Sequence, residues 1–433
     1  MANSNKIGLW SSTALVVGNM IGSGIFLLPA SLAVYGGIGM LGWVCSAIGA
    51  ILIAYVYGAL GKIAPDTLGG PYIYTRISFG DFPAYLVAWG YWVAIWATNA
   101  AIAVALVGYL EVFFPVLGES SLISIFTGLG FIWGFTYINS KPLKTVASIQ
   151  MITTILKVLP ILAIGVFGVF YINWENFIPL NRSDATTFGA ITATATLSLF
   201  AFLGMESAGI VSADTEDAAK TVSKATIGGT LITIVVYLSS SLAIMGIIPP
   251  EVLKNSNAPF ADAAHLFWGG SAQYIVAGCA VIATMGALNG WILMQGRIPM
   301  AAALDGLFPK IFGKQNSNGS PIIGIILSSF LASILMMLNF SKSLVDAFTF
   351  MMTLSTLSVI VPYLFSAASL GFILYNRDKK LTNPLIWISV LAFLFCIWII
   401  MGCGYEVVIY GLILFLISLP FYFVLKRKNK SNG

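Results

Sequence analysis

Long apolar runs, separated by short polar connections, cover nearly the whole chain. Twelve of these runs are about 20 residues long, which is the length that a helix needs to cross the hydrocarbon core of a bilayer. They lie near residues 9–34, 38–62, 83–113, 122–139, 144–172, 188–211, 225–248, 272–298, 321–339, 346–375, 384–402 and 405–425. The pattern predicts an all-α integral membrane protein with twelve transmembrane helices.

Two of the runs carry a polar, glycine-rich interruption. The first run contains GNMIGSGIF at residues 18–26, and the sixth contains FLGMESAG at residues 202–209. A helix is interrupted at membrane depth only where its freed backbone groups face protein, water or a solute. The two breaks are five helices apart and therefore lie in helices of opposite direction. This arrangement predicts a five-plus-five inverted repeat with broken helices one and six, as in secondary transporters.

The predicted helices form one transporter domain, because no long soluble segment separates them. We expect the domain to span residues 1–433, with repeats at about 9–172 and 188–375 and two additional helices at about 384–425. Two short connections, residues 71–76 and 306–310, could form amphipathic helices at the membrane interface.

The basic residues predict the orientation. With both termini in the cytoplasm, 17 of the 21 Lys and Arg residues fall on the cytoplasmic side. Only Arg182, Lys254 and Lys342 fall outside, and Lys157 lies within a span. This imbalance is the one that orients bacterial membrane proteins. The net charge of +5 reflects the same bias and implies no nucleic-acid partner.

Composition excludes several other classes of function. Only 9% of the residues are charged, against about 25% in soluble domains. The four cysteines lie in apolar runs without metal-ligand spacing, and the single histidine, His265, falls in a predicted loop. No nucleotide-binding motif is present. We therefore expect no enzyme activity, no metal and no cofactor. A channel would need a continuous polar stripe, whereas the polar residues here are isolated at the breaks.

The residues at the first break are candidates for binding a solute. Ser23 offers a hydroxyl, and the backbone around Gly24 offers free amides that suit an anionic group such as a carboxylate. The alternative is that these small residues only permit close packing of helices.

Two ionisable residues lie in the middle of predicted spans, where charge is costly. Glu206, in the second break, could titrate and couple transport to protons, or it could cap freed amides. Lys157, in the fifth span, could gain and lose a proton, or it could act as a fixed charge bonded to carbonyl groups of helix one.

Other polar and aromatic residues could line the same cavity. Trp291 could place its indole over a cationic substrate, or it could serve only in packing. Asn99 is a mid-span amide that needs a partner. Ser355 belongs to a weaker cluster of hydroxyls in the tenth span, where a hydroxyl can bond to its own helix.

These motifs resemble the amino acid–polyamine–organocation superfamily over essentially the whole chain. The matching stretches are GNMIGSGIF at 18–26, GMES at 204–207, and GRIP at 296–299 followed by DGLFP at 305–309. The chain is most similar to the basic amino acid/polyamine antiporters, especially the arginine/agmatine antiporters. The resemblance implies a LeuT-like fold of ten core helices and two more, in a homodimer in the bacterial inner membrane.

The resemblance also implies roles for individual residues. The substrate's carboxylate and amine would meet Ser23, Gly24 and the backbone near Met20 and Gly204. The guanidinium end of the substrate would contact Ala94, Ile95 and Asn99. Trp291 would stack on the substrate, Ser355 would correspond to a serine of the tenth span, and Tyr91 would be one of the gating aromatic residues. Phe200 stands where the arginine/agmatine antiporters have tryptophan. Lys157 is absent from those antiporters and resembles the fifth-helix lysine of other permeases in the superfamily.

The sequence thus predicts an amino acid transporter that works by alternating access. We expect exchange of a cationic amino acid, such as arginine, lysine or ornithine, for a related amine. Trp291 and Phe200 would enclose the substrate, and Glu206 or Lys157 would link the cycle to protons. The alternative is proton-coupled uptake of a neutral amino acid, because the charge of Lys157 opposes that of Glu206.

Overall fold

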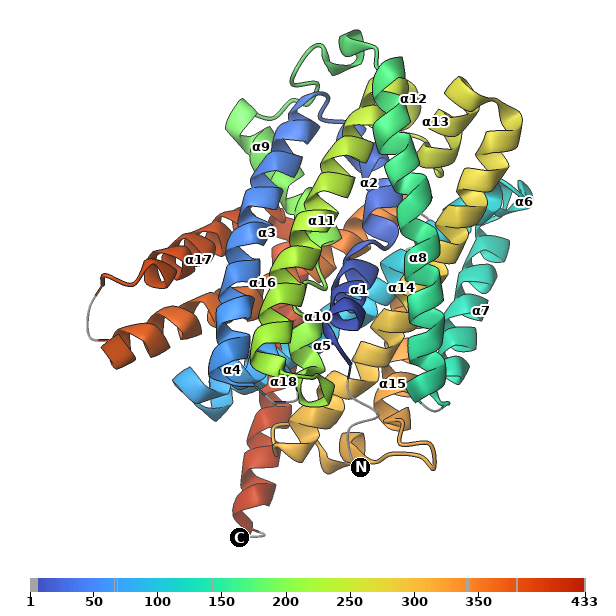
Figure 1. Ribbon diagram of the computed structural model, residues 1–433. Helices are drawn as coiled ribbons and strands as arrows, with labels where there is room; N and C mark the ends of the chain where they lie inside the picture. The colour runs from blue at the N-terminus through green and yellow to red at the C-terminus, as the bar shows by residue number, and fades with distance from the viewer. Residues whose placement is uncertain are drawn as a thin grey trace.

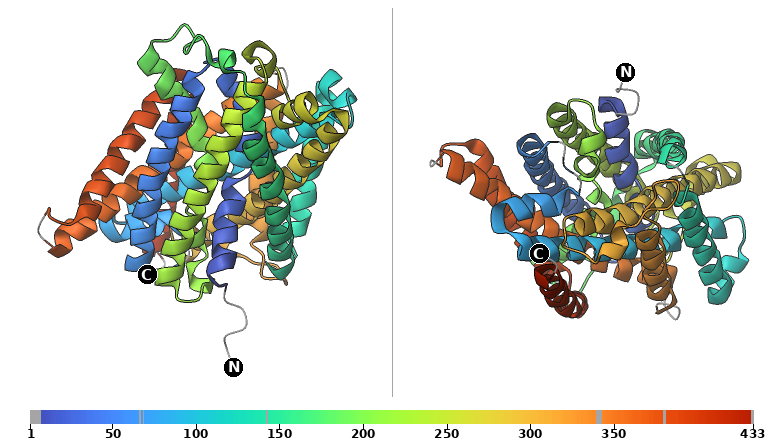
Figure 2. Two further views of the ribbon diagram at one scale, coloured as in Figure 1. Left: turned by 45° about the horizontal axis from the view of Figure 1, so that its top comes forward. Right: turned by 90° about the horizontal axis from the view of Figure 1, so that it is seen from below.

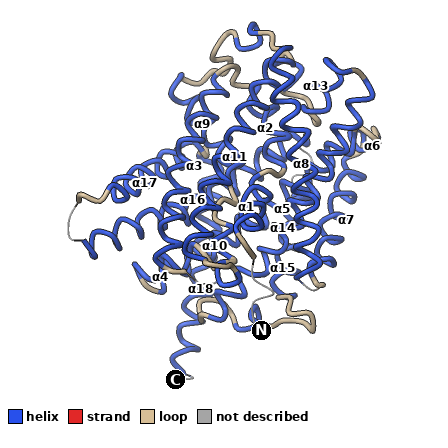
Figure 3. Tube along the Cα trace, viewed as in Figure 1, coloured by secondary structure: helices blue, strands red, loops and turns tan. Residues whose placement is uncertain are grey.

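The computed structural model describes residues 7–65, 67, 69–141, 143–338, 343–378 and 381–431. Lys342, which entered the prediction of orientation, lies outside them. The described residues form helices joined by loops, without a named strand (Figure 3). A single bridge pairs Ile7 with Thr215.

The helices follow the predicted apolar runs. Their bounds are α1 Leu9–Met20, α2 Ser23–Ala33, α3 Ile38–Ile63, α4 Pro71–Phe79, α5 Asp81–Glu111, α6 Val116–Glu119, α7 Ser121–Asn139, α8 Leu143–Phe167, α9 Thr187–Leu199, α10 Ser207–Ile210, α11 Ala218–Ile247, α12 Pro250–Leu253, α13 Pro259–Trp268, α14 Gly270–Leu304, α15 Ile322–Leu338, α16 Leu344–Asp378, α17 Pro384–Gly402 and α18 Tyr405–Ser431 (Figure 1).

Ten helical segments in the described residues are long and apolar enough to cross a membrane, counting α1 and α2 as one segment. Two shorter apolar helices, Thr187–Phe202 and Ile322–Leu338, lie at the sixth and ninth predicted runs. The all-helical membrane fold is therefore confirmed, while the exact number of twelve spans stays a prediction.

Both predicted helix breaks are present. Between α1 and α2, Ile21 (ψ 83°) and Gly22 (φ −124°, ψ −139°) leave helical geometry. Between α9 and α10, a 3-10 turn at Phe200–Phe202 is followed by Leu203 in an extended conformation and by Gly204 at φ 103°. Only glycine adopts such a positive φ without strain, so the chain turns at Gly204.

The broken helices lie inside the bundle. Two segments are almost entirely buried: the first broken helix, which consists of α1 and α2, and the helix α5. Most of the apolar part of α18 is not buried. α1 packs against α8, α10, α11 and α14, and α5 packs against α14 and α16. In the view from below, α17 and α18 lie at the rim (Figure 2). The breaks are therefore shielded from lipid by neighbouring helices.

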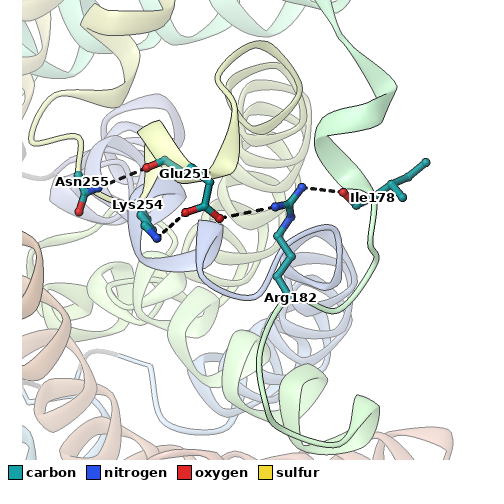
Figure 4. A network of polar contacts seen from close by, with 5 residues as sticks. All are labelled: Ile178, Arg182, Glu251, Lys254 and Asn255. Carbon is teal, nitrogen blue, oxygen red and sulfur yellow. Dashed lines mark hydrogen bonds and ion pairs between the residues drawn. The ribbon is translucent and has the colours of Figure 1, made fainter.

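At the end of the molecule opposite the two termini, a loop after α8 is bonded to neighbouring segments (Figure 4). The Arg182 guanidinium donates to the Ile178 carbonyl at 2.6 Å and lies 3.7 Å from Glu251. Lys254 donates to Glu251 at 2.5 Å. The hydrogen bond and charge of Lys254, followed by the charge of Arg182, lower the pKa of the Glu251 carboxyl. These contacts join the loop to α12.

Three local expectations have mixed outcomes. Residues 71–76 lie in the short helix α4, as predicted. Residues 306–309 are not helical, and only a 3-10 turn at Lys310–Gly313 follows them. The prediction that His265 lies in a loop is wrong, because it lies in α13, which begins at Pro259 with proline in its first turn. Proline is well tolerated at that position of a helix.

Candidate functional site

A cavity of about 10 Å³ lies where the two breaks meet. Both breaks contribute to its wall, together with α5 and α14. The lining residues are Asn19, Met20, Gly22, Ser23, Gly24, Thr98, Ile102, Phe200, Ala201, Leu203 and Trp291. All of them are buried. Of the residues predicted to bind substrate, Met20, Ser23, Gly24, Phe200 and Trp291 are thus brought together.

Ser23 begins α2 and presents an unused hydroxyl to this cavity. Its Oγ is buried and has no hydrogen-bond partner within the described part of the chain. The residue before α2 is Gly22, which has no side chain with which to cap the helix. The first N–H groups of a helix have no partner within that helix and carry partial positive charge. The hydroxyl and these amides could together bind a carboxylate.

The break in the first helix frees the carbonyl groups of residues 18, 19 and 20, which would otherwise accept bonds from the next turn. The Gly22 N–H bonds to Met20 O instead of Gly18 O. Side chains from three other helices donate to these carbonyls: Lys157 to Gly18 O, Trp291 Nε1 to Asn19 O at 3.2 Å, and the Tyr237 hydroxyl to Met20 O at 2.5 Å. The break is therefore stabilised by donors from α8, α14 and α11.

The two breaks are also joined to each other. The Asn19 amide donates to the Ser207 hydroxyl at 2.8 Å, and the Tyr237 hydroxyl lies 3.0 Å from Ala201 O as well as close to Met20 O. Gly204 does not line the cavity, but it lies against Asn19: a Cβ on Gly204 would be 3.0 Å from the Asn19 Cβ. Tyr237 was not among the predicted site residues, because a tyrosine in an apolar helix is not distinctive.

Gly24 lies in close contact with the second broken helix. A Cβ on this residue would lie 3.0 Å from both Cα and Cβ of Ala201. We expect Gly24→Ala to force the breaks apart and abolish most transport, because an overpacked contact costs about 1–3 kcal/mol. Uptake of labelled substrate into proteoliposomes measures this effect. Gly130→Ala is the control, since no heavy atom lies within 4 Å of a Cβ there; equal activity of the two variants would contradict the prediction.

Glu206 lies beside the second break, outside the cavity lining. Its carboxylate accepts hydrogen bonds from the Tyr91 hydroxyl, from the Tyr363 hydroxyl at 2.6 Å and from the Gly204 N–H at 3.2 Å. It is 1% exposed and is the only fully buried carboxylate whose side chain the structure describes. An ionised carboxylate, which is acceptor-only, satisfies three donors. Glu206 thus connects the second break to α5 and α16.

Lys157 lies at the first break rather than in the cavity. It is fully buried, and its ammonium donates to the Gly18 carbonyl. Within the described residues, no carboxylate forms an ion pair with it. The Lys157 side chain therefore joins α8 to the backbone of the first break.

Four residues predicted at the substrate's far end lie outside the cavity lining: Ala94, Ile95, Asn99 and Ser355. All are buried. The Ser355 hydroxyl lies 2.5 Å from that of Thr98, which lines the cavity, and 3.1 Å from Ala94 O. These residues form a layer behind the wall.

Asn99 is occupied by a partner that the sequence did not suggest. Its amide donates to Gln295 Oε1 at 2.7 Å, and Gln295 donates to the Ser329 hydroxyl at 2.7 Å. The Asn99 Oδ1 is buried without a partner among the described residues. Gln295 lies four residues after Trp291 and therefore on the same side of α14.

Comparisons with known proteins show the family of the chain. The profile of the amino acid permease family matches residues 7–425. A cadaverine/lysine antiporter of Escherichia coli (strain K12) is 33% identical over 98% of this chain and 95% of its own length. A putative arginine/ornithine antiporter of Bacillus subtilis (strain 168) is 32% identical over 85% of this chain and 84% of its own. A putrescine transporter of Haemophilus influenzae is 31% identical over 97% of each chain.

These relatives are transporters, not enzymes, and they cover nearly the full length of the chain. The predicted resemblance is therefore confirmed. The chain belongs to the amino acid permease family, within the basic amino acid/polyamine antiporter group of the amino acid–polyamine–organocation superfamily.

Proposed function

We propose that this protein is a secondary active antiporter that exchanges cationic amino acids, such as arginine, lysine or ornithine, for related amines by alternating access. The observation that carries the proposal is the meeting of two broken helices at one buried cavity, with the unpartnered Ser23 hydroxyl in its wall. The names of the relatives, which concern arginine, ornithine, lysine, cadaverine and putrescine, support this class of substrate.

In this proposal the whole chain is one transporter domain with a LeuT-like five-plus-five inverted repeat and twelve spans. It lies in a bacterial inner membrane as a homodimer, with both termini in the cytoplasm. The start of α1 and the end of α18 lie toward the same end of the molecule, which supports placing both termini on one side of the membrane (Figure 1).

The substrate would bind between the breaks, after the helices around them move apart. Its carboxylate would accept hydrogen bonds from the Ser23 hydroxyl and from the backbone amides that begin α2. Its amine would face the backbone near Met20 and Gly204. The side chain would extend between Phe200 and Trp291 toward Ala94, Ile95, Asn99 and Ser355. Tyr91 would act in gating, and Glu206 or Lys157 would couple the cycle to protons.

Trp291 provides the first test of this site. We expect Trp291→Ala to weaken binding of a cationic substrate by about 1–2 kcal/mol, the contribution of a desolvated cation–π contact. Isothermal titration calorimetry on purified protein measures the affinity. Trp291→Phe is the matched control, because it keeps a ring but removes the Nε1–H that bonds to Asn19 O. Unchanged affinity in the alanine variant would remove Trp291 from the site.

Proteoliposomes distinguish antiport from uptake. Vesicles are preloaded with one unlabelled amino acid or amine at a time, and labelled arginine, lysine or ornithine is added outside. The proposal expects uptake only with a cationic amino acid or a related amine inside. Empty vesicles under an inward proton gradient serve as the comparison.

A second candidate function is proton-coupled uptake of a neutral amino acid. The ammonium of Lys157 at the first break favours it, because a fixed positive charge opposes a cationic substrate. In the same assay, this function requires a neutral amino acid to enter empty vesicles down the proton gradient while the cationic ones do not enter.

A further inference from the structure

A second, larger cavity lies at the end of the molecule that carries both termini. Its volume is about 560 Å³, and it is formed by the start of α5, the turn after α14 and the last turns of α18. None of the residues assigned to transport above lines it.

The wall of this cavity is aromatic and apolar on one side. Phe82 and Tyr422 pack with ring centroids 5.0 Å apart, and Phe79, Leu307 and Leu425 extend the apolar surface. Phe79 and Phe82 remain 37% and 41% exposed. Tyrosine is enriched at the level of the lipid headgroups, and Tyr422 forms part of this wall. The cavity can be reached from the bilayer, because most of α18 is not covered by protein.

A positive charge lies beside this apolar wall. Lys426 lines the cavity and lies 5.9 Å from the Tyr422 ring. In the described part of the chain, neither Lys426 nor Arg427 forms an ion pair. They begin the sequence KRKNK at residues 426–430, which contains four basic residues and no acidic one.

One carboxylate also lines the cavity, but its charge is already compensated. Asp81 accepts from Arg76 Nε at 2.8 Å. The same guanidinium lies 3.5 Å from Asp305, which also accepts from the Tyr72 hydroxyl at 2.9 Å. Of the two charged side chains that line the cavity, Asp81 and Lys426, only Lys426 has no ion pair within the described residues.

We propose that this cavity binds the headgroup and upper acyl chain of an anionic phospholipid from the cytoplasmic leaflet. The phosphate would contact Lys426 and Arg427, and the acyl chain would lie along Phe82, Tyr422 and Leu425. Clusters of Lys and Arg next to a membrane helix attract anionic lipids, at about 1 kcal/mol for each basic residue. A volume of this size is also typical of pockets for small ligands.

Native mass spectrometry of the full-length protein tests the proposal with phosphatidylglycerol and phosphatidylcholine as probes. We expect wild-type protein to retain phosphatidylglycerol in preference. The double variant Lys426→Gln/Arg427→Gln should bind it about 10- to 30-fold less tightly. Lys310→Gln/Lys314→Gln is the matched control, because it removes two exposed lysines outside the cavity. Equal loss in both double variants, or no loss in either, would overturn the proposal.

Two further arms test the apolar wall and the source of the phosphate. Phe82→Ala should weaken retention of phosphatidylglycerol, whereas Phe423→Ala, an exposed residue outside the cavity, should not. Soluble glycerol 3-phosphate in excess should fail to displace the lipid. Displacement by glycerol 3-phosphate, or an unchanged Phe82→Ala variant, would show that the cavity does not recognise a lipid.

Discussion

Glu206→Gln should slow exchange by about 10- to 100-fold, because the loss of one hydrogen bond to a charged group raises the barrier by a corresponding free energy. The rate that remains should not depend on pH. The carboxylate accepts from Tyr91, Tyr363 and Gly204. A protonated carboxyl group, like the glutamine amide, carries a donor of its own, so one tyrosine hydroxyl must turn away. The glutamine variant therefore keeps permanently the hydrogen-bond arrangement that protonation of Glu206 would produce.

The measurement is the initial rate of exchange in proteoliposomes across a series of pH values, with the same pH on both sides. Tyr363→Phe is the matched control: it removes one donor but keeps the carboxylate, so its rate should still vary with pH. A Glu206→Gln profile that parallels the wild-type profile would make Glu206 a structural cap of the break.

Lys157→Met should reduce turnover by about 10- to 100-fold while changing substrate affinity much less. Methionine approximates the length of the side chain but cannot donate to the Gly18 carbonyl, which the break has freed. The carbonyl would be left without its charged donor in a buried place. We expect the main effect on the movement of the first helix, because Lys157 contacts its backbone and does not line the cavity.

Separate measurements of binding, by calorimetry, and of exchange, by labelled uptake, resolve the two quantities. Lys62→Met, which removes an exposed lysine at the end of α3, controls for the loss of one positive charge. Wild-type turnover in Lys157→Met would exclude a role for the ammonium in the cycle. A loss of affinity that equals the loss of turnover would place Lys157 in the binding site.

The sequence predicts the breaks well because their cause is local. Glycine and polar residues inside an apolar run leave few alternatives in a membrane, and the structure has Gly22 and Gly204 at the two turns. Ser23 could be placed at the site for the same reason, because it lies in the first break, whereas the places of Phe200 and Trp291 beside it were implied by the resemblance to known antiporters.

The partners of the polar side chains could not be predicted, because they depend on how the helices are rotated about their axes. Asn99 was expected in the cavity, yet its amide bonds to Gln295. Tyr363 and Tyr237 stand in apolar runs, and nothing in their neighbours along the chain distinguishes them from tyrosines that face lipid. The Tyr363 hydroxyl reaches Glu206 across 157 residues of sequence, and the Tyr237 hydroxyl reaches Met20 O across 217 residues and Ala201 O across 36.

The narrow cavity between the breaks has a consequence for the cell. Its volume of about 10 Å³ is enough for roughly one water molecule, and every residue around it is buried. A proton crosses a membrane readily only along a continuous file of water or titratable groups. In this form, the cavity between the breaks therefore has no room for a continuous file of water, and we expect vesicles that contain the closed carrier to dissipate a pH gradient no faster than protein-free vesicles.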